Sequence, residues 1–129
     1  MSQYQAFRVE LQDKIAHVVI DRADKINAMN AAFWTEIIDI FRWADETDEV
    51  RVVVLSGAGK HFSSGIDLNL LAQVSSQLGK DVGRNAQTLR RKIVELQASF
   101  NAVDHCSKPV LAAIPVSYTH LTLPTTPYV

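Results

Sequence analysis

The sequence has almost no cysteine, and this limits how the fold is held together. Its single cysteine, Cys106, has no second cysteine in the 129 residues with which to form a disulfide. Structural disulfides are typical of oxidising compartments, so a single cysteine fits a protein of a reducing compartment. We expect Cys106 to be a buried structural thiol and not a nucleophile.

The sequence also lacks an excess of charge and a long hydrophobic run. Thirteen basic and 14 acidic side chains give a formal net charge of −1, so charge gives no reason to expect nucleic acid or an anionic membrane as a partner. No apolar run approaches the length that spans a bilayer. Residues 1–5 have neither the basic nor the apolar segment of a secretion signal or transit peptide. We therefore expect a soluble, cytoplasmic protein.

A chain of this length forms at most one ordinary domain, or part of a larger one. Near its start, Phe7, Val9 and Leu11 alternate with polar residues, and residues 12–14 separate them from the apolar run 15–20. That pattern predicts a β-hairpin whose second strand is the more buried. A β-branched run at residues 50–55 predicts a strand buried on both faces, and residues 110–114 predict another buried strand.

Helical periodicity separates these strands. Asn30 is a predicted N-cap. The helix after it has an apolar stripe formed by Phe33, Ile37, Ile40, Phe41 and Ala44. A second helical stretch starts near residue 68, and residues 79–83 predict a mobile connection. The third and clearest amphipathic helix follows, with a stripe formed by Leu89, Ile93, Leu96, Phe100 and Val103. Alternating strands and helices predict an α/β fold.

A glycine-rich loop follows the predicted strand at residues 50–55. It contains Gly57, Gly59 and Gly65, and Asp67 then precedes an apolar helix start. A strand, a glycine-rich loop and a helix start together present backbone N–H groups to an anion or a polarised oxygen. Free N–H groups in residues 63–65 would form an oxyanion hole that polarises a carbonyl group. An ordinary tight turn is the alternative.

Two nucleotide-binding motifs use a similar loop, and neither fits this sequence. In a P-loop a hydroxyl residue follows Gly-Lys, whereas His61 follows Gly59-Lys60 here, so magnesium ligation fails. The dinucleotide-binding fingerprint needs a third glycine where this chain has Phe62, which would crowd the helix–strand contact. A nucleotide-binding module, which would bind ATP with magnesium, is therefore disfavoured.

Residues 57–68, Gly-Ala-Gly-Lys-His-Phe-Ser-Ser-Gly-Ile-Asp-Leu, resemble the first oxyanion loop of the crotonase (enoyl-CoA hydratase/isomerase) family. Residues 27–30, Asn-Ala-Met-Asn, resemble a second recurring element of that family and lie at the expected distance upstream. Within the family, residues 57–110 are most similar to the Δ3,5-Δ2,4-dienoyl-CoA isomerases, and residues 64–68 carry most of that similarity.

The resemblance implies the amino-terminal part of a crotonase-type ββα spiral and an enzyme that acts on acyl-CoA thioesters in β-oxidation. The implied reaction is isomerisation of a dienoyl-CoA, with hydration of an enoyl-CoA as the alternative. No cofactor or metal is implied, because coenzyme A is part of the substrate. Members of the family assemble as homotrimers or hexamers.

The resemblance also implies a site. The Ser64 N–H would hold the thioester carbonyl, and the substrate-binding residues would be Ala28, Ser63, Ser64, Gly65, Ile66, Asp67 and Leu68. Two side chains of the loop have simpler explanations than catalysis, since Asp67 suits a helix cap and His61 an exposed loop. The nucleophile-elbow pattern is absent, so serine hydrolysis is not expected. The acidic residues at 45–49 have no histidine close by, which favours a solvated helix end over a metal site.

The end of the chain differs from the rest. Residues 115–129 contain three of the four prolines, many threonines and no Asp or Glu. They resemble translated sequencing-adapter sequence, with a proline- and threonine-rich linker as the alternative. We therefore expect a truncated crotonase-like domain at residues 1–114 and a non-native or disordered tail at 115–129. The family's second oxyanion donor and its catalytic acids match nothing here, so we expect the chain as written to be inactive, or at most a non-catalytic acyl-CoA-binding fragment.

Overall fold

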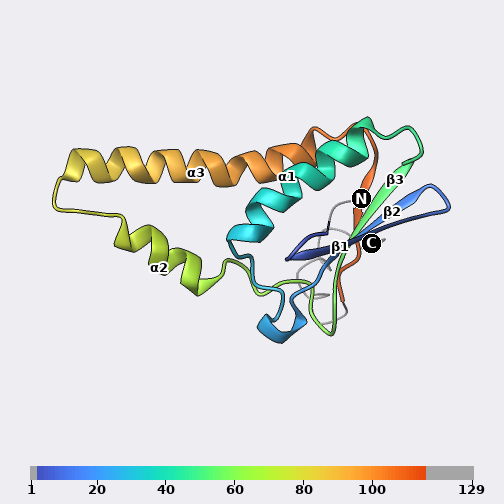
Figure 1. The fold of residues 1–129 in the computed structure, drawn as a ribbon, viewed down its shortest axis with the longest axis horizontal. Coiled ribbons are helices and arrows are strands. Elements are labelled where there is room, and N and C mark those ends of the chain that lie inside the picture. Colours follow the sequence, from blue (N-terminus) through green and yellow to red (C-terminus); the bar gives the residue numbers. More distant parts are fainter. Residues whose placement is uncertain (1–2, 116–129) are drawn as a thin grey trace, which may run out of the picture.

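A computed structural model of the chain describes residues 3–115, which form a four-stranded sheet with three α-helices beside it (Figure 1). The strands are β1 (Phe7–Gln12), β2 (Ile15–Ile20), β3 (Val52–Gly57) and β4 (Val110–Ala112). The helices are α1 (Ala31–Glu46), α2 (Leu68–Ser76) and α3 (Val82–Asp104), and a short 3-10 helix, η1 (Ala23–Lys25), precedes α1. Of the predicted tail at residues 115–129, residues 116–129 lie outside the described residues.

The predicted hairpin is confirmed. Strand β1 pairs antiparallel with β2, and Gln12 lies opposite Ile15, so only Asp13 and Lys14 form the turn. Both turn residues have positive φ, 53° and 67°, as a two-residue type I′ turn requires. The register places Ala16, Val18 and Ile20 on one face of β2, where all three are buried.

The other strand pairs are parallel, in the order β1-β2-β3-β4. Helix α1 connects β2 to β3, and α2 with α3 connects β3 to β4, which confirms the α/β class. The predicted stripe of α1 is confirmed as well, because all five of its residues are buried. They pack against Ala16, Val18 and Ile20 of the sheet in one core cluster. The Asn30 side chain caps α1 by accepting a hydrogen bond from the Phe33 N–H at 3.0 Å.

Two predictions of fully buried strands are wrong. In β3 only Val53 is buried, and its neighbours Val52 and Val54, which point to the opposite face, are partly exposed. The predicted strand at residues 110–114 shortens to β4, in which Leu111 is 60% exposed. Both results have one cause: α1 packs on one face of the sheet only, so alternate side chains of β3 and β4 lack a covering layer within residues 3–115.

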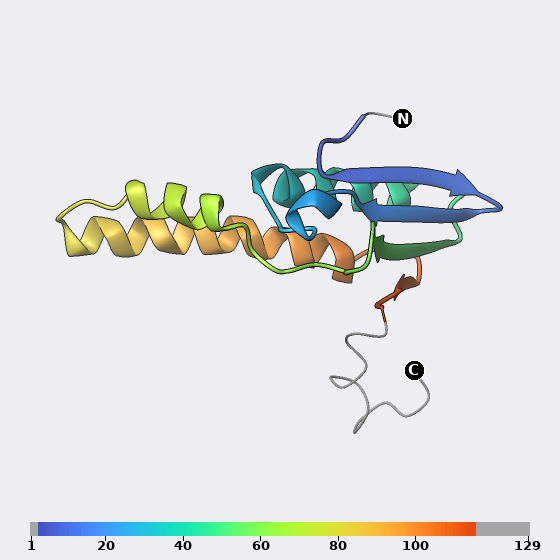
Figure 2. The same ribbon diagram turned by 90° about the horizontal axis from the view of Figure 1, so that it is seen from below.

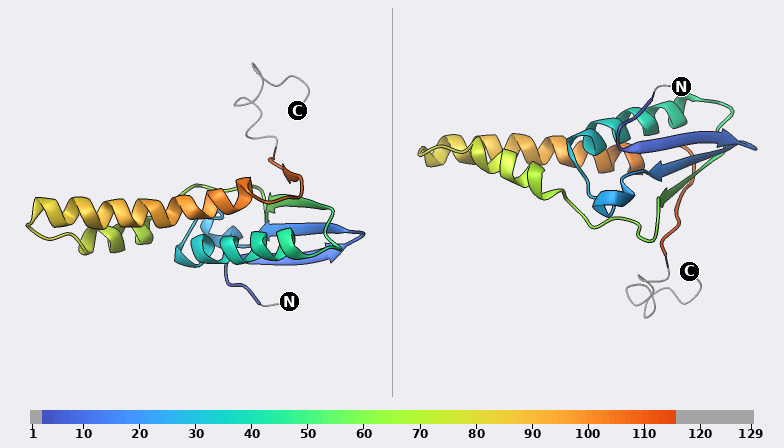
Figure 3. Two further views of the ribbon diagram at one scale, coloured as in Figure 1. Left: turned by 90° about the horizontal axis from the view of Figure 1, so that it is seen from above. Right: turned by 60° about the horizontal axis from the view of Figure 1, so that its bottom comes forward.

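Helices α2 and α3 form an arm that projects beyond the sheet (Figures 1 and 2). The far half of α3 extends away from α1 in both views of Figure 3, and the helix packs against α1 through its carboxyl-terminal half. The predicted stripe of α3 is therefore only partly used. Leu96 and Val103 pack against the core, whereas Ile93 and Phe100 are about half exposed. None of the helices in residues 3–115 is long and apolar enough to cross a membrane.

The connection between α2 and α3 contains several local hydrogen bonds. The Asp81 side chain caps α3 by accepting from the Arg84 N–H. The Asn85 amide makes two hydrogen bonds to the Gly79 backbone, donating to its oxygen at 2.8 Å and accepting from its N–H at 2.9 Å. These hydrogen bonds hold Gly79 to the first turn of α3, and the predicted mobility of residues 79–83 stays a prediction. The expected burial of Cys106 is also wrong in degree, because this thiol is only partly buried.

Candidate functional site

Two loops meet at one edge of the sheet. The first, residues 21–30, follows β2, and the second, residues 58–67, follows β3. Because β2 and β3 are parallel, their carboxyl ends lie side by side and bring together the two motifs that the sequence places some 30 residues apart. The candidate site is the junction of these loops.

Asn27 ties the two loops together. Its side chain is fully buried and makes three hydrogen bonds: it accepts from the Arg22 N–H at 2.9 Å and donates to the oxygens of Ala58, at 2.9 Å, and His61, at 2.8 Å. Its own carbonyl accepts the Ser63 hydroxyl at 2.8 Å. These hydrogen bonds fix the geometry of the two loops, because breaking them would leave buried polar groups unpaired.

Glycine is required at two positions of the second loop. A Cβ atom at Gly57 would lie 2.4 and 2.5 Å from the carbonyl oxygens of Phe62 and His61, so the backbone folds back too closely for any side chain. Gly65 has φ of +96°, which L side chains rarely adopt. The loop can therefore turn back beneath β3 and then enter α2.

Backbone strain in the first loop aims a carbonyl at the second. Ile26 and Asn27 both have left-handed φ, 53° and 54°, and this conformation is unfavourable for a β-branched residue such as Ile26. The Ile26 carbonyl consequently accepts a hydrogen bond from the Ser64 N–H at 2.9 Å. Strained residues held by their surroundings are common at functional sites.

The predicted free N–H groups of residues 63–65 are therefore not where the sequence placed them. The Ser64 N–H, predicted to hold a carbonyl, already donates to Ile26. The Gly65 N–H donates to the Ser63 hydroxyl oxygen at 3.1 Å. The prediction that the Ser64 N–H is free is wrong, because the strained Ile26 carbonyl occupies it.

A single β-bridge leaves the next N–H unpaired. Met29 and Ile66 form an isolated parallel bridge, in which the Met29 N–H donates to the Gly65 oxygen at 2.8 Å and the Asp67 N–H donates to the Met29 oxygen at 3.0 Å. The Gly65 carbonyl and the Ile66 N–H belong to one trans peptide group, so they point in opposite directions. The Ile66 N–H thus points away from Met29, and it has no hydrogen-bond partner among the described residues.

Asp67 is a helix cap, as the sequence predicts. Its side chain accepts from the Asn69 N–H at 2.8 Å and forms an ion pair with Arg22, whose Nη1 lies 3.2 Å from Oδ2. The hydrogen bond from the Asn69 backbone, followed by that from Arg22, lowers the pKa of the Asp67 carboxyl. A carboxylate with a lowered pKa has a low affinity for a proton, and both oxygens of Asp67 already have partners, so it makes a poor general base.

One hollow adjoins this junction and a second lies next to the first. A polar one of about 250 Å³ is lined by Arg22, Asn30, Ala31, Asp67, Asn69, Leu70 and Gln73. An apolar one of about 360 Å³ lies between α1, α2 and α3 and is lined by Ala31, Trp34, Thr35, Ile38, Leu70, Lys92, Glu95 and Leu96. They share Ala31 and Leu70, so the polar hollow beside the loops and the apolar one are neighbours.

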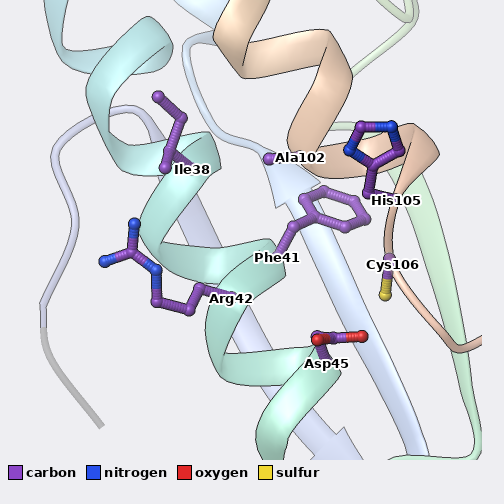
Figure 4. A pocket seen from close by; sticks show the side chains of 7 residues that line it. All are labelled: Ile38, Phe41, Arg42, Asp45, Ala102, His105 and Cys106. Atoms are coloured by element: carbon purple, nitrogen blue, oxygen red, sulfur yellow. The ribbon is translucent and has the colours of Figure 1, made fainter.

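A third hollow, of about 200 Å³, lies apart from the loops, between α1 and the end of α3 (Figure 4). Its polar side chains include Asp45, His105 and the free Cys106. Asp45 accepts from the Ser107 N–H at 2.6 Å, and hydrogen bonds from the Ser107 side chain and then from its backbone lower the pKa of the Asp45 carboxyl. In residues 3–115, no three His, Cys, Asp or Glu side chains gather closely enough to hold a metal ion.

Comparison with known proteins identifies the fold and its family. The sequence profile of the enoyl-CoA hydratase/isomerase family matches residues 10–115, which include both loops. The chain belongs to this family. Its curated relatives include a peroxisomal Δ3,5-Δ2,4-dienoyl-CoA isomerase of Arabidopsis thaliana, 43% identical over 109 residues, and a mitochondrial one of Rattus norvegicus, 42% identical over 113 residues. These matches cover 83% and 86% of this chain, but 39% and 35% of the relatives.

Solved structures agree with this assignment. An enoyl-CoA hydratase/isomerase from Marinobacter aquaeolei matches with a TM-score of 0.75 at 26% identity, over 85% of this chain and 41% of that one. An enoyl-CoA hydratase from Shewanella pealeana matches with a TM-score of 0.73 at 25% identity, over 88% of this chain and 40% of that one. The prediction of a crotonase fold, amino-terminal part, is confirmed. The chain spans about two fifths of the length of the relatives it matches.

The structure brings most of the predicted site residues together. Ala28 lies in the first loop and Ser63, Ser64, Gly65, Ile66 and Asp67 in the second, and the Met29–Ile66 bridge joins the two loops. Leu68 begins α2 with its side chain 78% exposed. The roles of Asn27 and Arg22 were not predicted from the sequence. The sequence shows only that an asparagine and an arginine lie in or beside a motif. Their hydrogen-bond partners in the second loop lie far away in the sequence, so no local pattern predicts them.

Proposed function

We propose that the junction of the two loops binds the carbonyl of an acyl-CoA thioester, and that the Ile66 N–H is its donor in place of Ser64. One observation supports this choice: among the backbone N–H groups of residues 64–67, that of Ile66 alone has no partner in the described residues. A donor that is held in place before the ligand arrives stabilises negative charge on the carbonyl oxygen without reorganisation. The other predicted residues, Ala28, Ser63, Ser64, Gly65, Asp67 and Leu68, shape the site around it.

The chemistry follows from this donor. Charge that moves onto the thioester oxygen lowers the cost of removing a proton from the carbon next to the carbonyl. In a dienoyl-CoA isomerase, removal and return of such a proton shift both double bonds. The identity to relatives named as dienoyl-CoA isomerases favours this reaction over hydration of an enoyl-CoA. A polar hollow next to an apolar one suits a thioester with an acyl chain.

We assign the donor to the described part of the chain but assign no general base to it. Asp67, its buried carboxylate, is held by Arg22 and α2, so it is unsuited to proton transfer. We propose that the chain as written binds acyl-CoA thioesters without turning them over. We further propose that the whole protein is a homotrimer or hexamer. A cytoplasmic location stays a prediction, whereas the names of the two relatives state peroxisomal and mitochondrial.

Titration calorimetry of the chain with octanoyl-CoA, free CoA and octanoate tests the binding. We expect octanoyl-CoA to bind more tightly than either part alone. Ile66→Pro removes the proposed donor, and we expect it to weaken octanoyl-CoA binding by about threefold to tenfold, the value of one hydrogen bond. Val82→Pro is the matched control, because Val82 is the first residue of α3, is 81% exposed and lies outside the site, and the first helical position tolerates proline.

Two results would contradict the proposal. Equal binding of octanoyl-CoA and octanoate would show that the site does not recognise the CoA thioester. Equal losses in the two proline variants would show that the Ile66 N–H has no special role. Incubation with a 3,5-dienoyl-CoA tests turnover. Formation of the 2,4-dienoyl product would disprove the proposal that this chain binds acyl-CoA thioesters without turning them over.

A further inference from the structure

Arg22 lies at the start of a continuous chain of hydrogen bonds that ends at the Ile66 N–H. Its Nη1 donates to the Ala28 carbonyl at 2.5 Å and also faces Asp67. The Ala28 carbonyl shares a peptide group with the Met29 N–H. That N–H donates to the Gly65 carbonyl, which shares a peptide group with the Ile66 N–H. The guanidinium group is thus linked to the unpaired donor through two peptide groups in series.

Both peptide groups have the same orientation along this chain. Each accepts a hydrogen bond at its oxygen from the Arg22 side and donates through its N–H toward the ligand side. A cation that polarises the first carbonyl makes the N–H of that peptide a stronger donor, and the next peptide is polarised in turn, by roughly 10–30% per bond. The Arg22 side chain is 17% exposed and Asp67 11%, so water screens the guanidinium only weakly.

We propose that Arg22 is a positioning residue that orients and polarises the Ile66 N–H through the Ala28–Met29 and Gly65–Ile66 peptides. This inference rests on the proposed function, because it concerns the same donor. Two roles of Arg22 can be distinguished. As a brace, Arg22 only holds the two loops together, and this needs its ion pair with Asp67. As a relay, Arg22 polarises the Ile66 N–H through the two peptide groups, and this needs its hydrogen bond to the Ala28 carbonyl.

The difference between relay and brace gives the experiment. Octanoyl-CoA labelled with ¹³C at the thioester carbon is bound to the full chain, and the carbonyl resonance is compared with that of the free ligand. A stronger donor moves this resonance further downfield. The variants are Arg22→Gln, Arg22→Lys and Asp67→Asn, with Arg8→Gln as control, since Arg8 forms an exposed ion pair 3.8 Å from Asp21.

We expect Arg22→Gln to reduce the carbonyl shift by about a third, as two weakened bonds in series predict. Arg22→Lys should restore most of it, because a cation remains. Asp67→Asn keeps the helix cap and Arg22, so its shift should equal or exceed that of the original chain. Arg8→Gln should change nothing.

If Arg22→Gln keeps the full carbonyl shift, the relay is overturned. If Arg22→Gln and Asp67→Asn lose the carbonyl shift to the same extent, the relay is also overturned, and Arg22 is only a brace. If Arg22→Gln does not fold, as judged by its helical circular dichroism, Asp67→Asn decides between the two by itself. If the unaltered chain binds octanoyl-CoA without any carbonyl shift, the proposed function fails first, and the relay fails with it. The two failures are thus distinguishable.

Discussion

The sheet with α1 and the arm of α2 and α3 contain similar apolar patterns but bury them differently. Every residue of the α1 stripe is buried, from Phe33 to Ala44. The α3 stripe is as regular, yet Ser99 is the one buried residue of this helix. Its hydroxyl donates to the Trp34 carbonyl at 2.8 Å, where α3 crosses α1. Periodicity therefore shows which face of a helix is apolar, and the tertiary structure decides whether that face is covered.

The loops of the candidate site resemble the sheet with α1 more than the arm, because their groups are held by many contacts. Their polar groups are paired across loops, as the buried side chain of Asn27 shows. Order in the sheet comes from apolar packing, whereas order in the loops comes from hydrogen bonds between residues about 30 positions apart. Four substitutions test this division, in order of expected effect.

The largest effect is expected from Phe41→Ala. Phe41 is 1% exposed in the core between α1 and the sheet, and removing its ring leaves a cavity. We expect the free energy of unfolding to fall by about 3–5 kcal/mol, measured by urea denaturation. A loss below about 1 kcal/mol would show that the sheet with α1 is not packed more tightly than the arm of α2 and α3.

The next largest effect is expected from Asn27→Ala, which leaves the Arg22 N–H and two carbonyls without their partner. We expect a loss of about 2–4 kcal/mol in unfolding free energy, because buried groups are left unpaired. Asn101→Ala on the exposed side of α3 is the matched control and should be neutral or slightly stabilising. Equal effects of the two changes would contradict the role of Asn27.

A gain in stability is expected from Ile26→Gly. Ile26 has φ of 53° and is 49% exposed, so glycine relieves backbone strain and removes little packing. We expect the unfolding free energy to rise by about 1 kcal/mol. Thermal unfolding followed by circular dichroism measures this change, and a loss of stability would show that Ile26 contributes more through packing than it costs in strain.

The smallest effect is expected from Ile93→Ala on the arm. This side chain is 52% exposed, and alanine has the higher helix propensity, so we expect a change within about 0.5 kcal/mol. Urea denaturation at two protein concentrations measures it. A loss similar to that of Phe41→Ala, and one that grows with concentration, would show that the arm is buried between copies of the chain.

Much of the fold could be predicted because its signals are local. The turn at Asp13-Lys14, the caps at Asn30 and Asp67 and the stripe of α1 each depend on residues within a few positions of one another. The family was recognisable for the same reason, since residues 27–30 and 57–68 are contiguous motifs. The sequence by itself determined the hairpin, the helices, the α/β class and the family.

The tertiary structure decided which groups of the site are available. Ser64 and Ile66 are two residues apart, and no local pattern distinguishes their N–H groups. The distinction arises because the Ile26 carbonyl reaches Ser64 across the two loops, while the Met29 bridge turns the Ile66 N–H away. Arg22 likewise meets Asp67 only after folding, 45 positions along the chain. Hydrogen bonds between distant segments depend on how the strands align, so only the folded chain reveals which donor remains for a ligand.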